Sequence, residues 1–152
     1  MSRRVVKPRI SWEDRFAAPS AAELLASLAK QHASLVQLAR DGLEELGEVS
    51  ESIVWHGVPW RWTFAFATEG ELERPWAYLV PQPGRPLLAM PLSGETISGL
   101  PMRKLSKGVR DGLTLAALVG GVYWPQWVLA SRAQVGELVG IARQRSRALA
   151  TA

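Results

Sequence analysis

Large aromatic side chains alternate strictly with other residues between positions 60 and 67. Trp60, Trp62, Phe64 and Phe66 occupy the even positions, and arginine, threonine and alanine occupy the odd ones. Successive side chains of a β-strand point to opposite faces, so this period of two predicts a strand with four aromatic rings on one face. Aromatic rings of this size dominate cores, and the segment therefore predicts a sheet that a second layer covers.

Three other segments have the composition of strands, namely residues 53–56, 76–80 and 87–90. Turn-forming stretches around Pro59 and Pro81 separate them from their neighbours. Connections this short favour antiparallel pairing. Residues 123–129 are expected to form a short edge strand or an extended segment, because Pro125 has no N–H to donate to a sheet.

Two capping boxes, Ser20 with Glu23 and Ser131 with Gln134, predict where the first and last helices begin. Leucines recur at helical spacing from residue 24 to residue 46, which predicts one helix that ends near Gly47. A middle helix is expected over residues 105–117, with the glycine pair 120–121 as its stop. The predicted order is α-β-β-β-β-α-β-α. We therefore expect an α+β fold, in which helices pack on one face of an antiparallel sheet of about five strands.

A chain of 152 residues has the length of one domain and buries roughly two thirds of its unfolded surface. Residues 1–18 are expected to form an irregular arm, tied down by Trp12 and Phe16, and residues 19–152 a single domain. The absence of cysteine excludes disulfides, thiolate metal sites and cysteine nucleophiles. No apolar run has the length of a membrane span, so we predict a cytoplasmic protein without a membrane partner.

Several stretches resemble a bacterial domain-of-unknown-function family, numbered DUF-3788. The matching segments are Trp62-Thr63-Phe64-Ala65-Phe66, Leu79-Val80-Pro81 and Leu138-Val139-Gly140-Ile141-Ala142-Arg143. Residues 55–59, Trp-His-Gly-Val-Pro, are similar instead to the YdhG-like family of small α+β proteins. Some members of the YdhG-like family have been likened to frataxin-type iron-handling domains. The resemblance implies an α+β fold, and neither family brings agreed catalytic residues.

Seven tryptophans make aromatic side chains the first candidate for function. The aromatic-rich sheet face predicts a pocket that accepts a small aromatic or cationic ligand. The alternatives are a plain hydrophobic core beneath the helices and the interface of a homodimer. The candidate ligand-binding residues are Trp55, His56, Trp60, Trp62, Phe64, Trp76, Tyr78 and Trp124.

Basic side chains are the second candidate, because residues 101–152 carry eight bases and two acids. The candidate anion-binding residues are Arg103, Lys104, Lys107 and Arg110, which helical spacing places on one face. Such a face would bind nucleic acid or another polyanion through its phosphates. Asp111 can pair with Lys107 at i, i+4, and no nucleic-acid motif accompanies the group, so a solvated helix face is the competing interpretation.

Acidic side chains are the third candidate. Asp41, Glu44, Glu45 and Glu48 fall on one face of the first predicted helix. Oxygen ligands suit hard or iron-like cations, but an acidic helix face is typically solvated, and the net charge of +4 argues against an iron-handling role. We therefore predict no metal site and no cofactor, and keep metal handling as an alternative.

Enzymatic chemistry has one candidate group, His56, as a lone acid or base. The sequence contains no nucleophile elbow, phosphate-binding loop, dinucleotide fingerprint or His-Glu-x-x-His motif. No catalytic residue is therefore predicted. The leading hypothesis is a non-catalytic domain that binds a small ligand or another protein through its aromatic sheet face. A polyanion-binding role, a metal-handling role and an enzyme that uses His56 are the alternatives.

Overall fold

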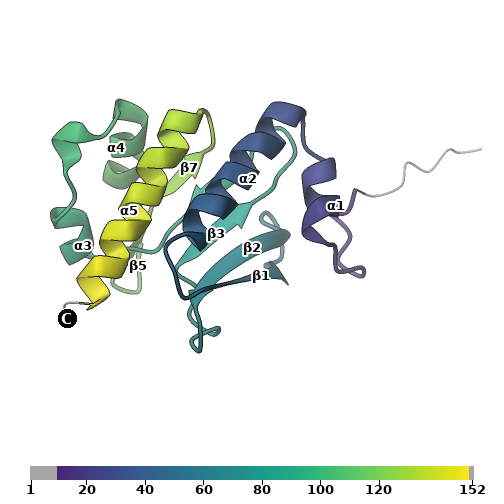
Figure 1. Ribbon diagram of the computed structural model, residues 1–152, viewed down its shortest axis with the longest axis horizontal. Helices are drawn as coiled ribbons and strands as arrows, with labels where there is room; N and C mark the ends of the chain where they lie inside the picture. Colours follow the sequence, from purple (N-terminus) through teal and green to yellow (C-terminus); the bar gives the residue numbers. More distant parts are fainter. Residues whose placement is uncertain (1–9, 151–152) are drawn as a thin grey trace, which may run out of the picture.

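The computed structural model describes residues 10–150, and the side chains of residues 10–146 (Figure 1). Five strands form one antiparallel sheet in the order β1-β2-β3-β4-β7. Their bounds are β1 Val49–Trp55, β2 Trp62–Thr68, β3 Ala77–Val80, β4 Leu87–Ala89 and β7 Gln126–Val128. A separate hairpin pairs β5 Ala117–Val119 with β6 Val122–Trp124.

Helices α2 Lys30–Glu44 and α5 Arg132–Ala150 lie side by side across one face of the sheet (Figure 1). Four shorter helical segments are α1 Ala21–Ala26, α3 Gly94–Ser98, the 3-10 helix η1 Met102–Lys104 and α4 Lys107–Thr114. The predicted fold class, an α+β protein with helices on an antiparallel sheet of five strands, is confirmed. Within the described residues, no helix combines the length and the apolar character needed to cross a membrane.

The first predicted helix is in fact two helices. Its capping box is present, because Ser20 Oγ accepts a hydrogen bond from the backbone N–H of Glu23 and the Glu23 carboxylate accepts one from the N–H of Ser20. However, α1 ends at Ala26, and α2 begins only at Lys30. Leu28, in the break, is buried as Leu24 is.

The middle region also differs from the prediction. The glycine pair does not stop a helix but forms the turn of the β5–β6 hairpin, and Gly120 and Gly121 both have positive φ, 59° and 79°. Two-residue hairpin turns need this conformation, which glycine adopts without steric cost. Helix α4 therefore ends at Thr114, and Ala117 belongs to a strand. The connection from β4 to α4, for which the sequence predicts no regular element, contains the short helix α3.

The register of the sheet shows which side chains face the helices. Phe64 pairs with Leu79, Leu79 with Leu88, and Leu88 with Trp127, so these four side chains share one face. The guanidinium of Arg40, on α2, lies 4.7 Å from the centroid of the Phe64 ring. This face is therefore the one that the helices cover, and it holds most of the hydrophobic core, although Val80, Leu87 and Ala89 of the same core point to the opposite face.

The segment before α1 is attached to the sheet by tryptophans. Trp12 is buried, and its indole N–H donates to the carbonyl of Trp60 at 3.0 Å. The indole N–H of Trp62 donates in the opposite direction, to the carbonyl of Asp14 at 2.7 Å. Phe16 is 86% exposed and contributes nothing to the attachment, contrary to the prediction. The first nine residues of the predicted arm lie outside the described residues.

Candidate functional site

The structure divides the predicted ligand-binding residues between the two faces of the sheet. Trp62, Phe64 and Trp76 are 8%, 0% and 3% exposed and lie in the core. Trp55 pairs with Trp62 across β1 and β2, and the two rings meet edge to face with centroids 5.6 Å apart. Trp62, Phe64 and Trp76 build the fold and are not available to a ligand without unpacking it, whereas Trp55 is half-buried and packs against the core.

Trp60 does not share the face of Trp62, although strict alternation predicts that it should. Arg61 has a φ of 58°, in the left-handed region, and β2 begins only at Trp62. A residue in this conformation breaks the alternation of an extended strand, so Trp60 turns away from the core. The prediction of four aromatic rings on one strand face was therefore wrong for the first of them.

Four aromatic side chains meet on the sheet face opposite the helices, and we call His56, Trp60, Tyr78 and Trp124 the aromatic row. Ring centroids are 5.8 Å apart for His56 and Trp60, 5.1 Å for His56 and Tyr78, 5.5 Å for Trp60 and Tyr78, and 5.9 Å for Tyr78 and Trp124. All four spacings fall in the range of favourable aromatic contacts. His56 is exposed, and the other three side chains are half-buried.

The position of Tyr78 follows from the register. Tyr78 pairs with Ala65 on one side and with Ala89 on the other, and its neighbours in β3 point to the helices. Ala65 and Ala89 are buried at 2% and 0% exposure even though no helix covers their face. Their small side chains leave room for the rings of the aromatic row to lie on the sheet.

The outward-pointing strand positions around the aromatic row hold no charged side chain. By register, the strand positions that point away from the helices are Ser50, Ser52, Val54, Thr63, Ala65, Ala67, Tyr78, Val80, Leu87, Ala89, Gln126 and Val128. Partial desolvation by the neighbouring rings and the sheet lowers the pKa of His56 and raises the pKa of Tyr78. Both shifts favour the neutral forms, so the aromatic row is uncharged near neutral pH.

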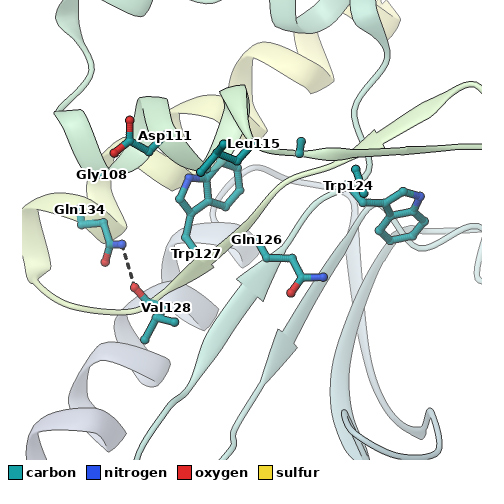
Figure 2. Close-up of a pocket in the computed structure, with 11 residues that line it drawn as sticks. Gly108, Asp111, Leu115, Trp124, Gln126, Trp127, Val128 and Gln134 are labelled. Carbon is teal, nitrogen blue, oxygen red and sulfur yellow. Dashed lines mark hydrogen bonds between the residues drawn. The ribbon is translucent and has the colours of Figure 1, made fainter.

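A groove of about 540 Å³ begins where the aromatic row ends, at Trp124 (Figure 2). Gln126 and Val128 of β7 line it on one side, and Leu115 and Ala117, at the connection from α4 to β5, line it on the other. Leu115 is 81% exposed, and Val128 is 39% exposed. The groove therefore has an apolar rim that is open to solvent, and sequence periodicity alone did not reveal it.

The predicted anion-binding residues do not form one helix face. Arg103 and Lys104 belong to η1, whereas Lys107 and Arg110 belong to α4, and Leu105 between them is extended. All four basic side chains are exposed. The predicted pair of Lys107 with Asp111 is present at 3.9 Å and is also exposed, so it contributes little stability.

The acidic residues Asp41, Glu44, Glu45 and Glu48 are exposed. They do not share one continuous helix face, because α2 ends at Glu44 and Glu48 has a positive φ of 54°. Asp41 accepts a hydrogen bond from Gln37 at 2.7 Å. Among the described residues, no three side chains of the metal-ligating types lie close enough to hold an ion. The acidic cluster therefore has the geometry of a solvated surface.

Acid–base chemistry at His56 would need a partner. Its ring contacts Trp60 and Tyr78, and over residues 10–146 its side chain forms no hydrogen bond with a carboxylate or a nucleophile. The site combines partly exposed aromatic rings with neutral hydrogen-bonding groups, a composition that suits flat molecules. Scans of protein-family models, of curated proteins and of solved structures found no match to this chain.

Proposed function

We propose that the protein is a non-enzymatic recognition domain whose aromatic row binds a small ligand with a planar, uncharged ring. The observation that carries this proposal is the contact of His56, Trp60, Tyr78 and Trp124 on the sheet face without helices. Rings gathered at a solvent-accessible surface are a common way to bind flat molecules, because stacking is worth about 1–3 kcal/mol per ring. The cysteine-free composition supports a cytoplasmic location as part of the same proposal.

The uncharged surroundings favour a neutral ligand over an ionic one. A cation would gain attraction from the faces of the tryptophans, but the strands present no carboxylate on this side to complete its binding. An anion would find no basic side chain among the same outward strand positions. Neutral His56 offers one donor and one acceptor to the edge of a heterocyclic ring.

Tryptophan fluorescence and melting temperature test this proposal. The wild-type protein is titrated with adenosine, riboflavin and indole as neutral planar compounds, and with tetramethylammonium as a cationic one. We expect at least one planar compound to quench the emission and raise the melting temperature, and Trp60→Ala to weaken that binding by about tenfold or more. Phe16→Ala is the matched control, because Phe16 is an exposed aromatic residue outside the aromatic row.

The proposal fails if no planar compound binds, or if Trp60→Ala and Phe16→Ala leave the same affinity. An exposed aromatic surface can also bind a second copy of the chain, and sedimentation velocity on both variants tests for such a dimer. A dimer that Trp60→Ala dissociates would assign the aromatic row to self-association and contradict the small-ligand proposal.

A further inference from the structure

The outer edge of the sheet is only half occupied. Strands β6 and β7 follow one another across Pro125 and share a single ladder with residues 86–92 on their inner side. The ladder bonds are reciprocal between Leu92 and Tyr123, and continue from Met90 N–H to the Pro125 carbonyl and from Leu129 N–H to the Pro86 carbonyl. On the outer side, β5 pairs with β6 but ends before it reaches β7. Strand β5 therefore occupies the position of a sixth strand beside β6, and the same position is empty beside β7.

The open half presents backbone groups that are ready to pair. In an antiparallel ladder the backbone groups of alternate residues point to the same side. Residues 123, 125, 127 and 129 point to β4, so the N–H and C=O groups of Gln126 and Val128 point outward. The Val128 carbonyl accepts a hydrogen bond from Gln134 Nε2 at 2.9 Å (Figure 2). The N–H and C=O of Gln126 and the N–H of Val128 have no partner among the described residues.

The groove lies at this same edge. Gln126 and Val128 line it, and Leu115, two residues before β5 begins, lines it as well (Figure 2). We propose that the groove binds an extended peptide of a partner protein, which adds to β7 as the missing half of the sixth strand. The proposal is independent of a ligand on the aromatic row, since Trp124 is the only residue that the two surfaces share.

The lining of the groove indicates the chemistry of the peptide. Its rim is apolar at Leu115 and Val128, which favours a large apolar side chain in the peptide. Asp111 is the single charged residue of the lining, and its pair with Lys107 is a weak, exposed one. We therefore expect the peptide to carry a basic residue next to its apolar residue, because a positive charge complements the negative charge of Asp111.

Fluorescence anisotropy on the full chain tests the proposal with a labelled, capped peptide of sequence Lys-Val-Val-Ser-Val-Val-Lys, in which the valine two residues from the serine shares a face with Val128 in antiparallel pairing. We expect saturable binding that N-methylation of the central serine weakens by about tenfold or more, because this removes the N–H that pairs with the Gln126 carbonyl. N-methylation of the adjacent valine is the matched control. Its N–H points away from β7 in the paired register, so this peptide should bind as the unmodified one does.

Two variants test the protein side. Gln126→Pro removes the outward N–H without breaking any internal hydrogen bond, and should weaken binding by about tenfold or more. Gln126→Ala also loses the glutamine side chain but keeps the outward N–H, so it should bind the peptide more tightly than Gln126→Pro. If Gln126→Pro fails to fold, the methylated peptides on the wild-type protein decide the question alone. Absence of binding, equal binding of the peptides methylated at serine and valine, or a folded Gln126→Pro protein with wild-type affinity overturns the proposal. If the wild-type protein is a homodimer and the folded Gln126→Pro variant is a monomer, the edge of β7 binds a second copy of the chain, and this result also overturns the proposal.

Discussion

Gly112 and Trp127 are packed so closely that a methyl group at Gly112 would overlap the indole nitrogen of Trp127 and lie 2.9 Å from its Cε2 atom. The contact joins α4 to the edge strand β7, and the indole N–H of Trp127 donates to the carbonyl of Val109 at 3.0 Å. Trp127 is 3% exposed, so this nitrogen has to be paired within the protein. The absence of a side chain at one position therefore allows the buried hydrogen bond at the other.

Gly112→Ala should destabilise the protein by about 2–4 kcal/mol, because the added methyl group displaces Trp127 from its bond with Val109. Gly108→Ala, in the same helix, is the matched control. An added Cβ there meets nothing within 4 Å, and alanine should stabilise α4 by about 0.5–1 kcal/mol. Urea unfolding of the three proteins measures both changes. Similar stabilities for the two variants would show that Trp127 can repack without loss.

Trp62→Ala and Trp124→Ala should separate the two roles of the tryptophans. Trp62 is 8% exposed and bonded to the carbonyl of Asp14, so its truncation should cost about 3–5 kcal/mol. Trp124 is half-buried on the open face, and its truncation should cost about 1 kcal/mol or less. Thermal denaturation followed by circular dichroism gives both values. Equal losses would mean that the aromatic row belongs to the folding core.

Arg40 and Glu51 connect α2 to β1 through two hydrogen bonds of 2.9 and 2.6 Å, and both side chains are 15% exposed. The hydrogen bond with Glu51 raises the pKa of Arg40 above its ordinary value. Glu51→Gln and Arg40→Met should each destabilise the protein by about 1–3 kcal/mol, because each leaves a charged partner poorly paired. The double variant should lose less than the sum, with a coupling energy of about 1–3 kcal/mol. Additive losses in urea unfolding would show that the pair is energetically unimportant.

Protonation of His56 should weaken the fold in mild acid. Burial lowers the pKa of His56 in the folded protein below its ordinary value of 6.5, so the unfolded chain takes up the proton first as the pH falls. The contribution of His56 to stability is therefore complete above about pH 6.5. It declines as the pH falls towards the folded-state pKa, and is constant below it. His56→Phe keeps an aromatic ring but cannot bind a proton, and its melting temperature should fall less than that of the wild type between about pH 8 and pH 5. Parallel curves for the two proteins would contradict this effect.

Local patterns predicted much of the fold. Both predicted N-caps are present, because each serine hydroxyl accepts the N–H of the residue three positions later. The capping box is complete only at Ser20, since Gln134 accepts the N–H of Ala130 and not that of Ser131. The alternation over residues 62–66 placed Phe64 in the core, and Pro125 correctly indicated a strand near the sheet edge. These features depend on neighbouring residues only, which is why the sequence was sufficient for them.

The aromatic row depended on features that periodicity does not contain. Its members come from the end of β1, a turn, β3 and β6, so only the tertiary fold brings them together. The positive φ of Arg61 moved Trp60 to the opposite face, and nothing in the alternation signals it. The hairpin at the glycine pair before Val122, by contrast, has a local signal, because two glycines between short apolar runs are typical of a hairpin turn. The prediction of a helix stop there is therefore wrong for a reason that the sequence contains.

The paired indole bonds of Trp12 and Trp62 link the segment before α1 to the turn that carries Trp60. Arg61 adds to this connection, with its guanidinium carbon 5.1 Å from the centroid of the Trp12 ring. A protein shortened to begin at Ser20 would lose the buried Trp12 and both indole bonds, so the turn that carries Trp60 would be held less firmly. A test of the proposed binding on such a fragment would therefore examine an altered aromatic row, and the proposal has to be tested on a chain that includes Trp12.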